Sequence, residues 1–298
     1  MKRIDLKVGF DCNNMCLFCV QGDKRFKHKP RTKEEIFAKL EEGKKDGATG
    51  VVFTGGEPTV HPDIIEAIKY AKKIGYTSIQ IQTNGRAFAD YNYCLELIEA
   101  GVNEFAPSLH GFNPETHDML VGVPGAWKKT VVGLANLQKL KQFVLMNTVI
   151  TKQNYKELPN LATLFIKLGV SQFQLAFIHI LGSADKNKIE IVPKKSDIIP
   201  YVHKALDIGK KCGIICMTEA VPFCLMKGYE WAIAEYNFMP ETEVFDAECT
   251  IESYAEYRWN EGKAKGSQCK ICKYKNICEG PWKEYPEIYG WDEFIAVK

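Results

Sequence analysis

The chain has 298 residues, and its 39 basic and 37 acidic side chains leave a net charge of +2. This balance gives no general attraction to nucleic acid or to an anionic membrane. The hydrophobic fraction of 46% suffices for a sizeable core, and no run of about 18 apolar residues could span a bilayer. The sequence begins without the apolar core of a signal peptide and has eleven cysteines, an odd number. We therefore expect a cytoplasmic protein whose cysteines bind metal rather than form disulfides.

Segments typical of strands alternate with segments of helical period along the first two thirds of the chain. The predicted strands cover residues 4–10, 50–54, 78–83, 102–109, 143–151 and 173–181. The first predicted helix begins after Thr32, which forms a capping box with Glu35. The other predicted helices cover residues 63–74, 91–100, 127–140, 158–168 and 196–212. Six βα units predict an α/β fold, a partial TIM-type barrel of parallel strands, with an open doubly wound sheet as the alternative.

The periodicity weakens after about residue 190, and the rest of the chain is rich in cysteines, aromatic residues and loops. We therefore predict a barrel domain over residues 1–215 and a small cysteine-rich extension over residues 216–298.

Three cysteines follow the first predicted strand in the sequence FDCNNMCLFCV, namely Cys12, Cys16 and Cys19. Catalytic residues of barrel enzymes lie at the C-terminal ends of the strands. Structural zinc sites use four ligands, whereas a four-iron cluster on three thiolates keeps one iron open for a substrate or cofactor. A zinc knuckle completed by His28 is the alternative interpretation.

The next predicted strands also end in distinctive sequences: GGEP at 55–58, TNG at 83–85 and SLHG at 108–111. An aromatic residue, Phe18, precedes the third cysteine. With these features the chain resembles the radical S-adenosylmethionine (SAM) superfamily over residues 4 to about 182. CNNMCLFC is similar to the CxxxCxxC motif of that family, and GGEP to its glycine-rich SAM motif.

The resemblance implies a (β/α)6 partial barrel and a 4Fe–4S cluster on Cys12, Cys16 and Cys19, whose open iron chelates SAM. It implies an enzyme that reductively cleaves SAM to a 5′-deoxyadenosyl radical, which abstracts hydrogen from a substrate. A one-electron reductant such as flavodoxin or ferredoxin would supply the electron. The residues that the resemblance places around SAM are Phe18, Gly55, Gly56, Glu57, Asn84, Ser108 and Asn147.

A second set of cysteines lies near the C-terminus. CKICKYKNIC contains Cys269, Cys272 and Cys278, and Cys224 and Cys249 lie upstream. The pattern resembles the core of the SPASM and Twitch extensions of radical SAM enzymes, which hold auxiliary 4Fe–4S clusters, and zinc is the alternative. The full SPASM pattern has a further cysteine beyond this core, which this chain lacks. One auxiliary cluster is therefore expected, with the choice of four ligands among the five cysteines left open.

The remaining signals are weaker. Cys94, Cys212 and Cys216 are expected to be small core residues. The segment DKRFKHKPR at 23–31 is either a solvated basic loop or a docking surface for an acidic electron donor or an anionic substrate. No catalytic acid, base or radical relay can be named.

The substrate is not readable from these motifs. Because SPASM and Twitch relatives commonly modify peptides, peptide or protein side-chain modification is the leading hypothesis, by analogy alone. Cofactor or small-metabolite biosynthesis is the first alternative. A non-catalytic iron–sulfur or zinc protein is the second. No membrane partner is expected, and nucleic acid is not favoured.

Overall fold

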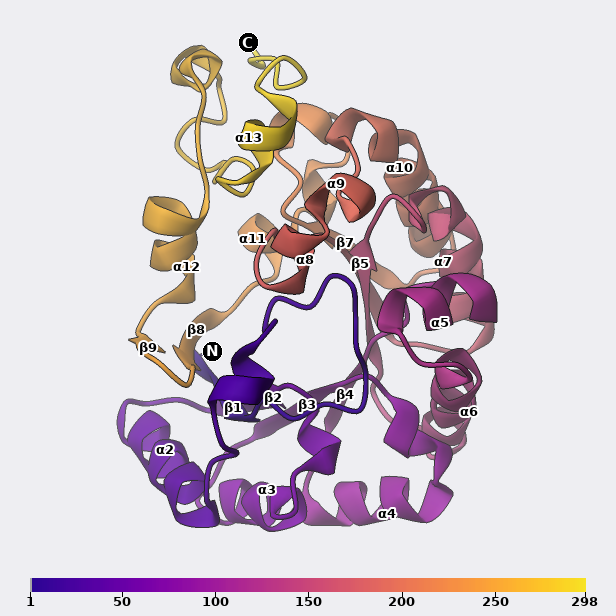
Figure 1. Ribbon diagram of the computed structural model, residues 1–298, viewed down its shortest axis with the longest axis vertical. Coiled ribbons are helices and arrows are strands. Elements are labelled where there is room, and N and C mark those ends of the chain that lie inside the picture. The colour runs from indigo at the N-terminus through magenta and orange to yellow at the C-terminus, as the bar shows by residue number, and fades with distance from the viewer. Residues whose placement is uncertain (1) are drawn as a thin grey trace.

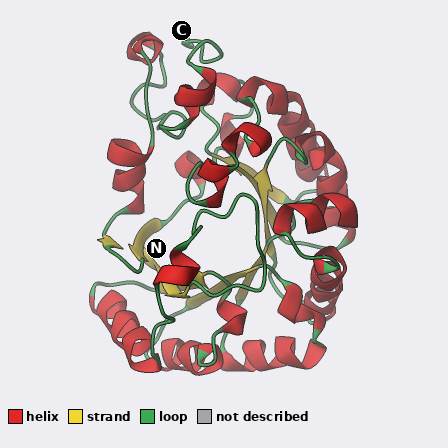
Figure 2. Cartoon of the chain, viewed as in Figure 1, coloured by secondary structure: helices red, strands yellow, loops and turns green. Residues whose placement is uncertain are grey.

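The computed structural model describes residues 2–298 and shows an incomplete ring of strands inside a crescent of helices (Figure 1, Figure 2). The expected α/β class and partial barrel are confirmed. The strands are β1 Lys2–Gly9, β2 Gly50–Gly55, β3 Ser78–Thr83, β4 Glu104–Pro107, β5 Leu145–Ile150, β6 Gln172–Phe177, β7 Ile215–Glu219, β8 Glu241–Phe245 and β9 Thr250–Ile251. The helices are α1 Lys24–Lys27, α2 Lys33–Lys45, α3 Ile64–Lys73, α4 Tyr91–Ala100, α5 Pro114–Val121, α6 Ala126–Lys139, α7 Leu158–Lys167, α8 Ser183–Lys186, α9 Lys188–Ile191, α10 Lys195–Lys211, α11 Ala234–Asn237, α12 Tyr254–Tyr257 and α13 Tyr285–Tyr289.

The strands form two sheets with the orders β4-β3-β2-β1-β8-β9 and β5-β6-β7. All pairs are parallel except β8 with β9. Isolated bridges between Phe105 and Val144 and between Ser108 and Asn147 join the sheets at β4 and β5. On the other side the ring stays open, since no strand pairing joins β7 to β9 within residues 2–298.

The six predicted helices form as α2, α3, α4, α6, α7 and α10, whereas α5 and the short helices were not predicted. Thr32 Oγ1 accepts a hydrogen bond from Glu35 N, and the Glu35 carboxylate accepts one from Thr32 N, so the capping box is confirmed. The apolar faces of the helices pack on the outer faces of the strands, where Phe53 and Phe105 are fully buried. Each such side chain contributes about 1.5–3 kcal/mol by its burial.

The inner faces of the strands are polar. On β1, Ile4 and Leu6 are buried in the outer core, whereas Arg3, Asp5 and Lys7 line a cavity of about 860 Å³ inside the ring. This alternation follows from the two-residue period of a strand. The ring therefore encloses a polar space large enough for a substrate rather than a packed apolar core.

Several elements were not expected from the sequence. Strand β7 pairs with β6, and β8 pairs with β1, so strands beyond residue 215 extend both sheets of the ring. The division into residues 1–215 and 216–298 remains a prediction, and the later segment contributes to the barrel as well as to the cysteine-rich end.

The three expected core cysteines have different surroundings. Cys94 and Cys216 are buried, as expected. The expectation for Cys212 is wrong, because this residue caps the C-terminus of α10 and is exposed. Within residues 2–298, no helix is long and apolar enough to cross a membrane.

Candidate active site

A cavity of about 390 Å³ lies at the C-terminal ends of the strands, where barrel enzymes act. Cys12, Cys16 and Cys19 line it from the loop that follows β1. All seven residues expected around SAM line the same cavity: Phe18, Gly55, Gly56, Glu57, Asn84, Ser108 and Asn147. The structure therefore brings together, around one space, residues that are spread over more than a hundred positions of the sequence.

The cysteine loop is held in place by backbone hydrogen bonds from two sides. Met15 N donates to Val121 O at the end of α5, over 2.8 Å. Ser183 N, at the start of α8, donates to Cys19 O, also over 2.8 Å. These contacts satisfy backbone groups that lie outside any helix or strand, and they fix the loop above the strand ends.

The three thiols share a partly buried position. Burial raises the pKa of Cys16 well above its usual range, and the charges of Cys19 and Cys12 raise it further. The pKa of Cys12 is also raised by burial, while a hydrogen bond from Asn14 N to its sulfur, over 3.4 Å, acts in the opposite direction. Mutually repelling thiolates are stabilised by bound metal, so this donor set fits an iron–sulfur cluster.

The zinc alternative gains no support from the structure. The Nε2 atom of His28 lies 3.0 Å from the Glu248 carboxylate, and this histidine does not line the cysteine cavity. Within residues 2–298, no three His, Cys, Asp or Glu side chains are grouped around a point where they could share a single metal ion, whereas the cysteines of a four-iron cluster each bind a different iron.

The two glycines of the GGEP segment allow a close backbone approach. Gly55 has φ +126°, and a Cβ there would lie 2.0 Å from Gly9 O; at Gly56 it would lie 2.3 Å from Asp11 O. Gly56 N donates to Gly9 O and Glu57 N donates to Asp11 O, each over 2.8 Å. A side chain at either position would collide with the backbone that leads into the cysteine loop, so both positions require glycine.

Glu57 is buried and ties the ends of β2 and β3 together. Its Oε1 accepts from Thr59 Oγ1 and Thr83 Oγ1 over 2.6 and 2.5 Å, and its Oε2 accepts from Asn84 N over 2.6 Å. Burial raises the pKa of Glu57, while these hydrogen bonds act in the opposite direction. The predicted place of Glu57 beside SAM stays a prediction, and the contacts seen here also make Glu57 a positioning residue.

Polar groups link the strand ends to the cysteine loop. Asn84 Nδ2 donates to Asn13 Oδ1 over 2.6 Å. Arg86, which sequence reasoning missed, donates to Asn13 O and Asn14 Oδ1 over 2.6 and 2.8 Å. Asn147 Oδ1 on β5 is buried at the cavity wall and has no hydrogen-bond partner within residues 2–298. A buried acceptor without a partner is costly, so this atom fits a bound ligand that carries a donor.

Phe18 and two histidines form an apolar part of the wall. The Phe18 ring meets His110 edge to face, with centroids 4.6 Å apart. His117 Nδ1 accepts from His110 N over 3.0 Å. Burial lowers the pKa of both histidines, that of His117 to about 4. Neutral imidazoles that accept hydrogen bonds from backbone N–H groups have a structural role.

The second cysteine group is separate from the first. One pocket is lined by four cysteines: Cys224, Cys269, Cys272 and Cys278. Burial and then the charges of the other three raise the pKa of Cys224 to about 12. Cys249, also counted among the metal ligands from sequence, is exposed in the β8–β9 turn and lines the large cavity instead. The structure therefore separates Cys249 from the four.

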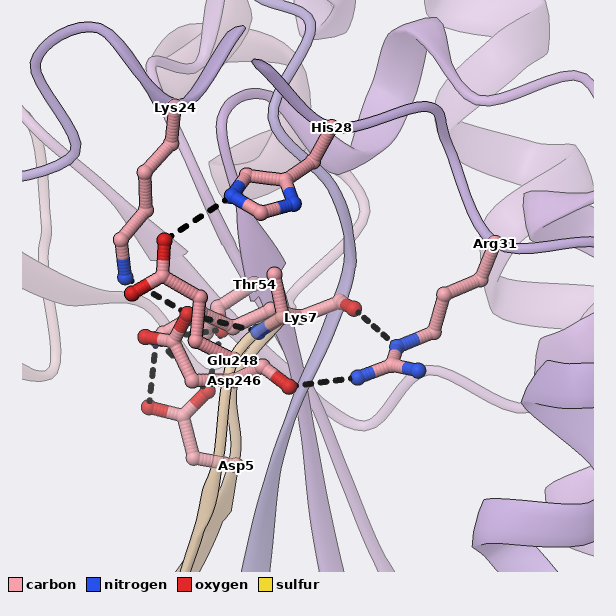
Figure 3. A network of polar contacts seen from close by, with 9 residues as sticks. Asp5, Lys7, Lys24, His28, Arg31, Thr54, Asp246 and Glu248 are labelled. Carbon is pink, nitrogen blue, oxygen red and sulfur yellow. Dashed lines mark hydrogen bonds and ion pairs between the residues drawn. The ribbon is translucent and has the colours of Figure 1, made fainter.

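Some cations of the basic loop at 23–31 are bonded to the rest of the protein (Figure 3), and a docking role for the loop stays a prediction. Lys24 Nζ lies 2.6 Å from the Asp246 carboxylate. Arg31 donates to Lys7 O and Asp246 O over 3.0 and 2.7 Å. Lys24 and Arg31 therefore fasten the loop to β1 and to the segment after β8, while Lys27 is exposed.

Comparison with known proteins identifies the family. The model of the radical SAM superfamily matches residues 6–165, more than half of the chain. The chain belongs to the radical SAM superfamily. Its relatives include proteins named probable GTP 3′,8-cyclase. That of Saccharolobus islandicus is 30% identical over 172 residues, 57% of this chain and 55% of the relative. That of Sulfurisphaera tokodaii is 30% identical over 210 residues, 68% of this chain and 64% of the relative. The chain thus spans a little more than half the length of the first relatives.

Solved structures show the same fold at low identity. SuiB from Streptococcus suis, bound to precursor peptide SuiA, has a TM-score of 0.68 and 15% identity and covers 99% of this chain and 75% of its own. The enzyme anSMEcpe with bound AdoMet has a TM-score of 0.69 and 15% identity, over 99% and 96% of the two chains. At this identity the likeness concerns the fold alone.

Proposed function

We propose that this radical SAM protein is an enzyme that cleaves SAM reductively on a 4Fe–4S cluster held by Cys12, Cys16 and Cys19. The observation that carries the proposal is the single cavity lined by these three cysteines and by all seven residues expected around SAM. The buried, unpartnered Asn147 Oδ1 supports it further, as does membership of the family, whose fold and cysteine motif imply both groups.

The bound cluster and SAM would supply a 5′-deoxyadenosyl radical that abstracts hydrogen from a substrate. The chain's own residues position the reactants and exclude water. Glu57 and Asn84 hold the ends of β2 and β3 against the cysteine loop. Phe18, only 7% exposed, keeps solvent from one wall, which limits quenching of reactive species.

We place the substrate in the cavity of about 860 Å³ inside the ring. Asn147 and His179 line both this cavity and the cysteine cavity, so the two spaces adjoin. Modification of a peptide or protein side chain remains the leading hypothesis, supported by the size of this cavity and by its wall of amide and carboxylate groups.

A second candidate is cofactor biosynthesis on a nucleotide, favoured by the relatives named GTP 3′,8-cyclase. A triphosphate is usually bound by unpaired Arg and Lys side chains. Here Lys7, Lys24 and Arg258 line the large cavity, and each is already in an ion pair with a carboxylate, which leaves one lining cation of residues 2–298, Arg3, without an ion pair. This shortage of unpaired cations argues against a triphosphate in this cavity. We therefore rank a nucleotide substrate below a peptide or protein side chain.

We also propose one auxiliary 4Fe–4S cluster on Cys224, Cys269, Cys272 and Cys278. The support is that these four thiols line one pocket, and thiolates are the usual ligands of such clusters. A flavodoxin or ferredoxin is the proposed electron donor.

The experiment is anaerobic incubation of the reconstituted protein with SAM and dithionite. It should yield 5′-deoxyadenosine and methionine in equal amounts. Iron-loaded protein that leaves SAM intact would contradict the proposal. GTP added to the same reaction should not be consumed, and its conversion would favour the second candidate.

A further inference from the structure

Glu219 lies at the C-terminal end of β7, outside the segment that the family model matches. It lines both the cysteine cavity and the large cavity, so it sits at their boundary. Gln174 Nε2 on the adjacent strand donates to its Oε2 over 2.6 Å. Its other oxygen, Oε1, has no hydrogen-bond partner within residues 2–298 and is not fully buried. One carboxylate oxygen therefore remains available to a bound molecule.

The two cations near Glu219, Lys263 and Arg258, form ion pairs with other carboxylates. Lys263 Nζ lies 3.5 Å from Glu235, and Arg258 donates two hydrogen bonds to Glu279, over 2.9 and 3.0 Å. Both cations are buried, with side chains 0% and 3% exposed. Burial, followed by the charge of Glu235, raises the pKa of Glu219 to about 7. Within residues 2–298, Glu219 thus lies beside the cavity without an ion-pair partner, although the charges of Lys263 and Arg258 oppose the rise in its pKa.

The nearby wall adds no positive charge. The imidazole of His179 stacks on Trp282, with centroids 3.7 Å apart and planes within 6°. Burial, with help from Lys263, lowers the pKa of His179 to about 3, so the ring is neutral at neutral pH. Tyr254 lines the same boundary and is uncharged there, because burial and the neighbouring Glu219 raise its pKa.

The rest of the large cavity also has more unpaired carboxylates than unpaired cations in its wall. Among its lining carboxylates, those without an ion-pair partner in the described chain are Glu219, Glu252, Glu256 and Glu261. The only lining Lys or Arg without such a partner is Arg3, within residues 2–298. The accessible charge in the cavity is therefore negative, and it would attract cations and repel phosphates.

We propose that Glu219 binds a cationic group of the substrate, an ammonium or a guanidinium, at the boundary between the two cavities. This inference rests on the proposed function, which puts SAM in the adjoining cavity. A charge-assisted hydrogen bond to the free oxygen is stronger than a neutral one, and it would hold the substrate beside the place where the radical forms.

The test is calorimetry on the anaerobically reconstituted enzyme, saturated with SAM and without reductant. The probes are the N-acetyl methylamides of lysine, arginine and norleucine. At pH 8 a cationic probe should bind about tenfold more tightly than norleucine, and Glu219→Gln should abolish this preference. Glu287→Gln, which removes the same charge from the exposed face of α13, is the control and should leave the preference intact.

The pH dependence gives a second readout. With a pKa of about 7, Glu219 is ionised to about 10% at pH 6 and about 90% at pH 8, so affinity for the lysine probe should rise up to about ninefold between them. The lysine probe stays charged throughout, since its pKa is about 10.4. In Glu219→Gln the rise should disappear.

Each outcome decides the proposal. A preference for lysine or for arginine supports it and tells an ammonium from a guanidinium. Norleucine binding as well as either cation, or no probe binding, overturns it, as does a Glu219→Gln enzyme that loses affinity for SAM instead. These binding measurements require no turnover. Failure of SAM cleavage would therefore contradict the proposed function, but it would not produce any of the binding results above.

Discussion

The two cysteine groups differ in how the chain builds them. The first lies in a loop between β1 and α1, within the family-matched segment, and it donates hydrogen bonds to α5 and accepts one from α8. The second is assembled from a turn near Cys224 and from the loops around Cys269 and Cys278, outside that segment. The first presents three thiols beside polar strand ends, whereas the second presents four thiols in an almost wholly apolar pocket.

This difference separates two kinds of chemistry. Three ligands beside ligand-binding groups leave a cluster with an open iron, whereas four ligands in an apolar pocket make a closed one. A closed cluster suits electron transfer or structure. The comparison therefore predicts that only the first group supports SAM cleavage, and that the second can be removed without losing that step.

The largest effect is expected from removing the first group. The native enzyme should bind roughly eight irons per chain, and changing Cys12, Cys16 and Cys19 together to Ala should leave about half of them and no detectable 5′-deoxyadenosine. Iron analysis and chromatography of the products measure both. Cys249→Ala, which changes a cysteine outside both groups, should match the native enzyme. Continued SAM cleavage by the triple variant would show that the first group is misassigned.

Removing the second group should cost iron but not SAM cleavage. Cys269→Ala combined with Cys272→Ala should lower iron by about four per chain, while 5′-deoxyadenosine still forms with dithionite. Stoichiometric zinc in the native protein, lost in this variant, would replace the auxiliary cluster with a zinc site.

Glu57→Gln sharpens the account of the first site. The amide nitrogen of Gln cannot accept from Asn84 N or the threonine hydroxyls, and losing a charged acceptor costs on the order of 2 kcal/mol. We expect SAM affinity to fall by about tenfold and the free energy of unfolding to fall with it. Calorimetry and thermal unfolding measure the two. Weaker SAM binding at unchanged stability would instead indicate a direct contact.

The smallest effect concerns the basic loop. Lys24 pairs with Asp246, whereas Lys27 is exposed, so Lys24→Gln should lower the free energy of unfolding by up to about 1 kcal/mol and Lys27→Gln should leave it unchanged. If either residue steers an acidic donor, its variant should slow turnover with flavodoxin at low salt but not with dithionite. Equal stability of the two variants would mean that the ion pair with Asp246 contributes nothing.

Much of the barrel and of the first site could be predicted from the sequence. Six strands and six helices follow from local periodicity and caps such as that of Thr32. The SAM-site residues follow from short motifs at successive strand ends, and parallel strands bring those ends together whatever their separation in sequence.

The rest depends on contacts that no local pattern encodes. Strand β8 has the sequence ETEVF, which lacks the alternation of apolar and polar residues typical of a strand, and its place beside β1 is set by pairing across more than two hundred residues. Glu219 was not predicted as a site residue because β7 was not predicted. Had that strand been predicted, a carboxylate at its C-terminal end would have been a candidate site residue. The burial of Glu57 under hydrogen bonds from Thr83 and Asn84, which adds a positioning role to its predicted place beside SAM, could be seen only with β3 in place.

The central claim is that SAM binds at the open iron of a cluster on the first cysteine group. The most direct measurement is electron paramagnetic resonance on the reduced Cys269→Ala and Cys272→Ala variant, which keeps only that cluster. We predict one 4Fe–4S signal whose shape and g values change when SAM is added. A signal that is identical with and without saturating SAM would contradict the account.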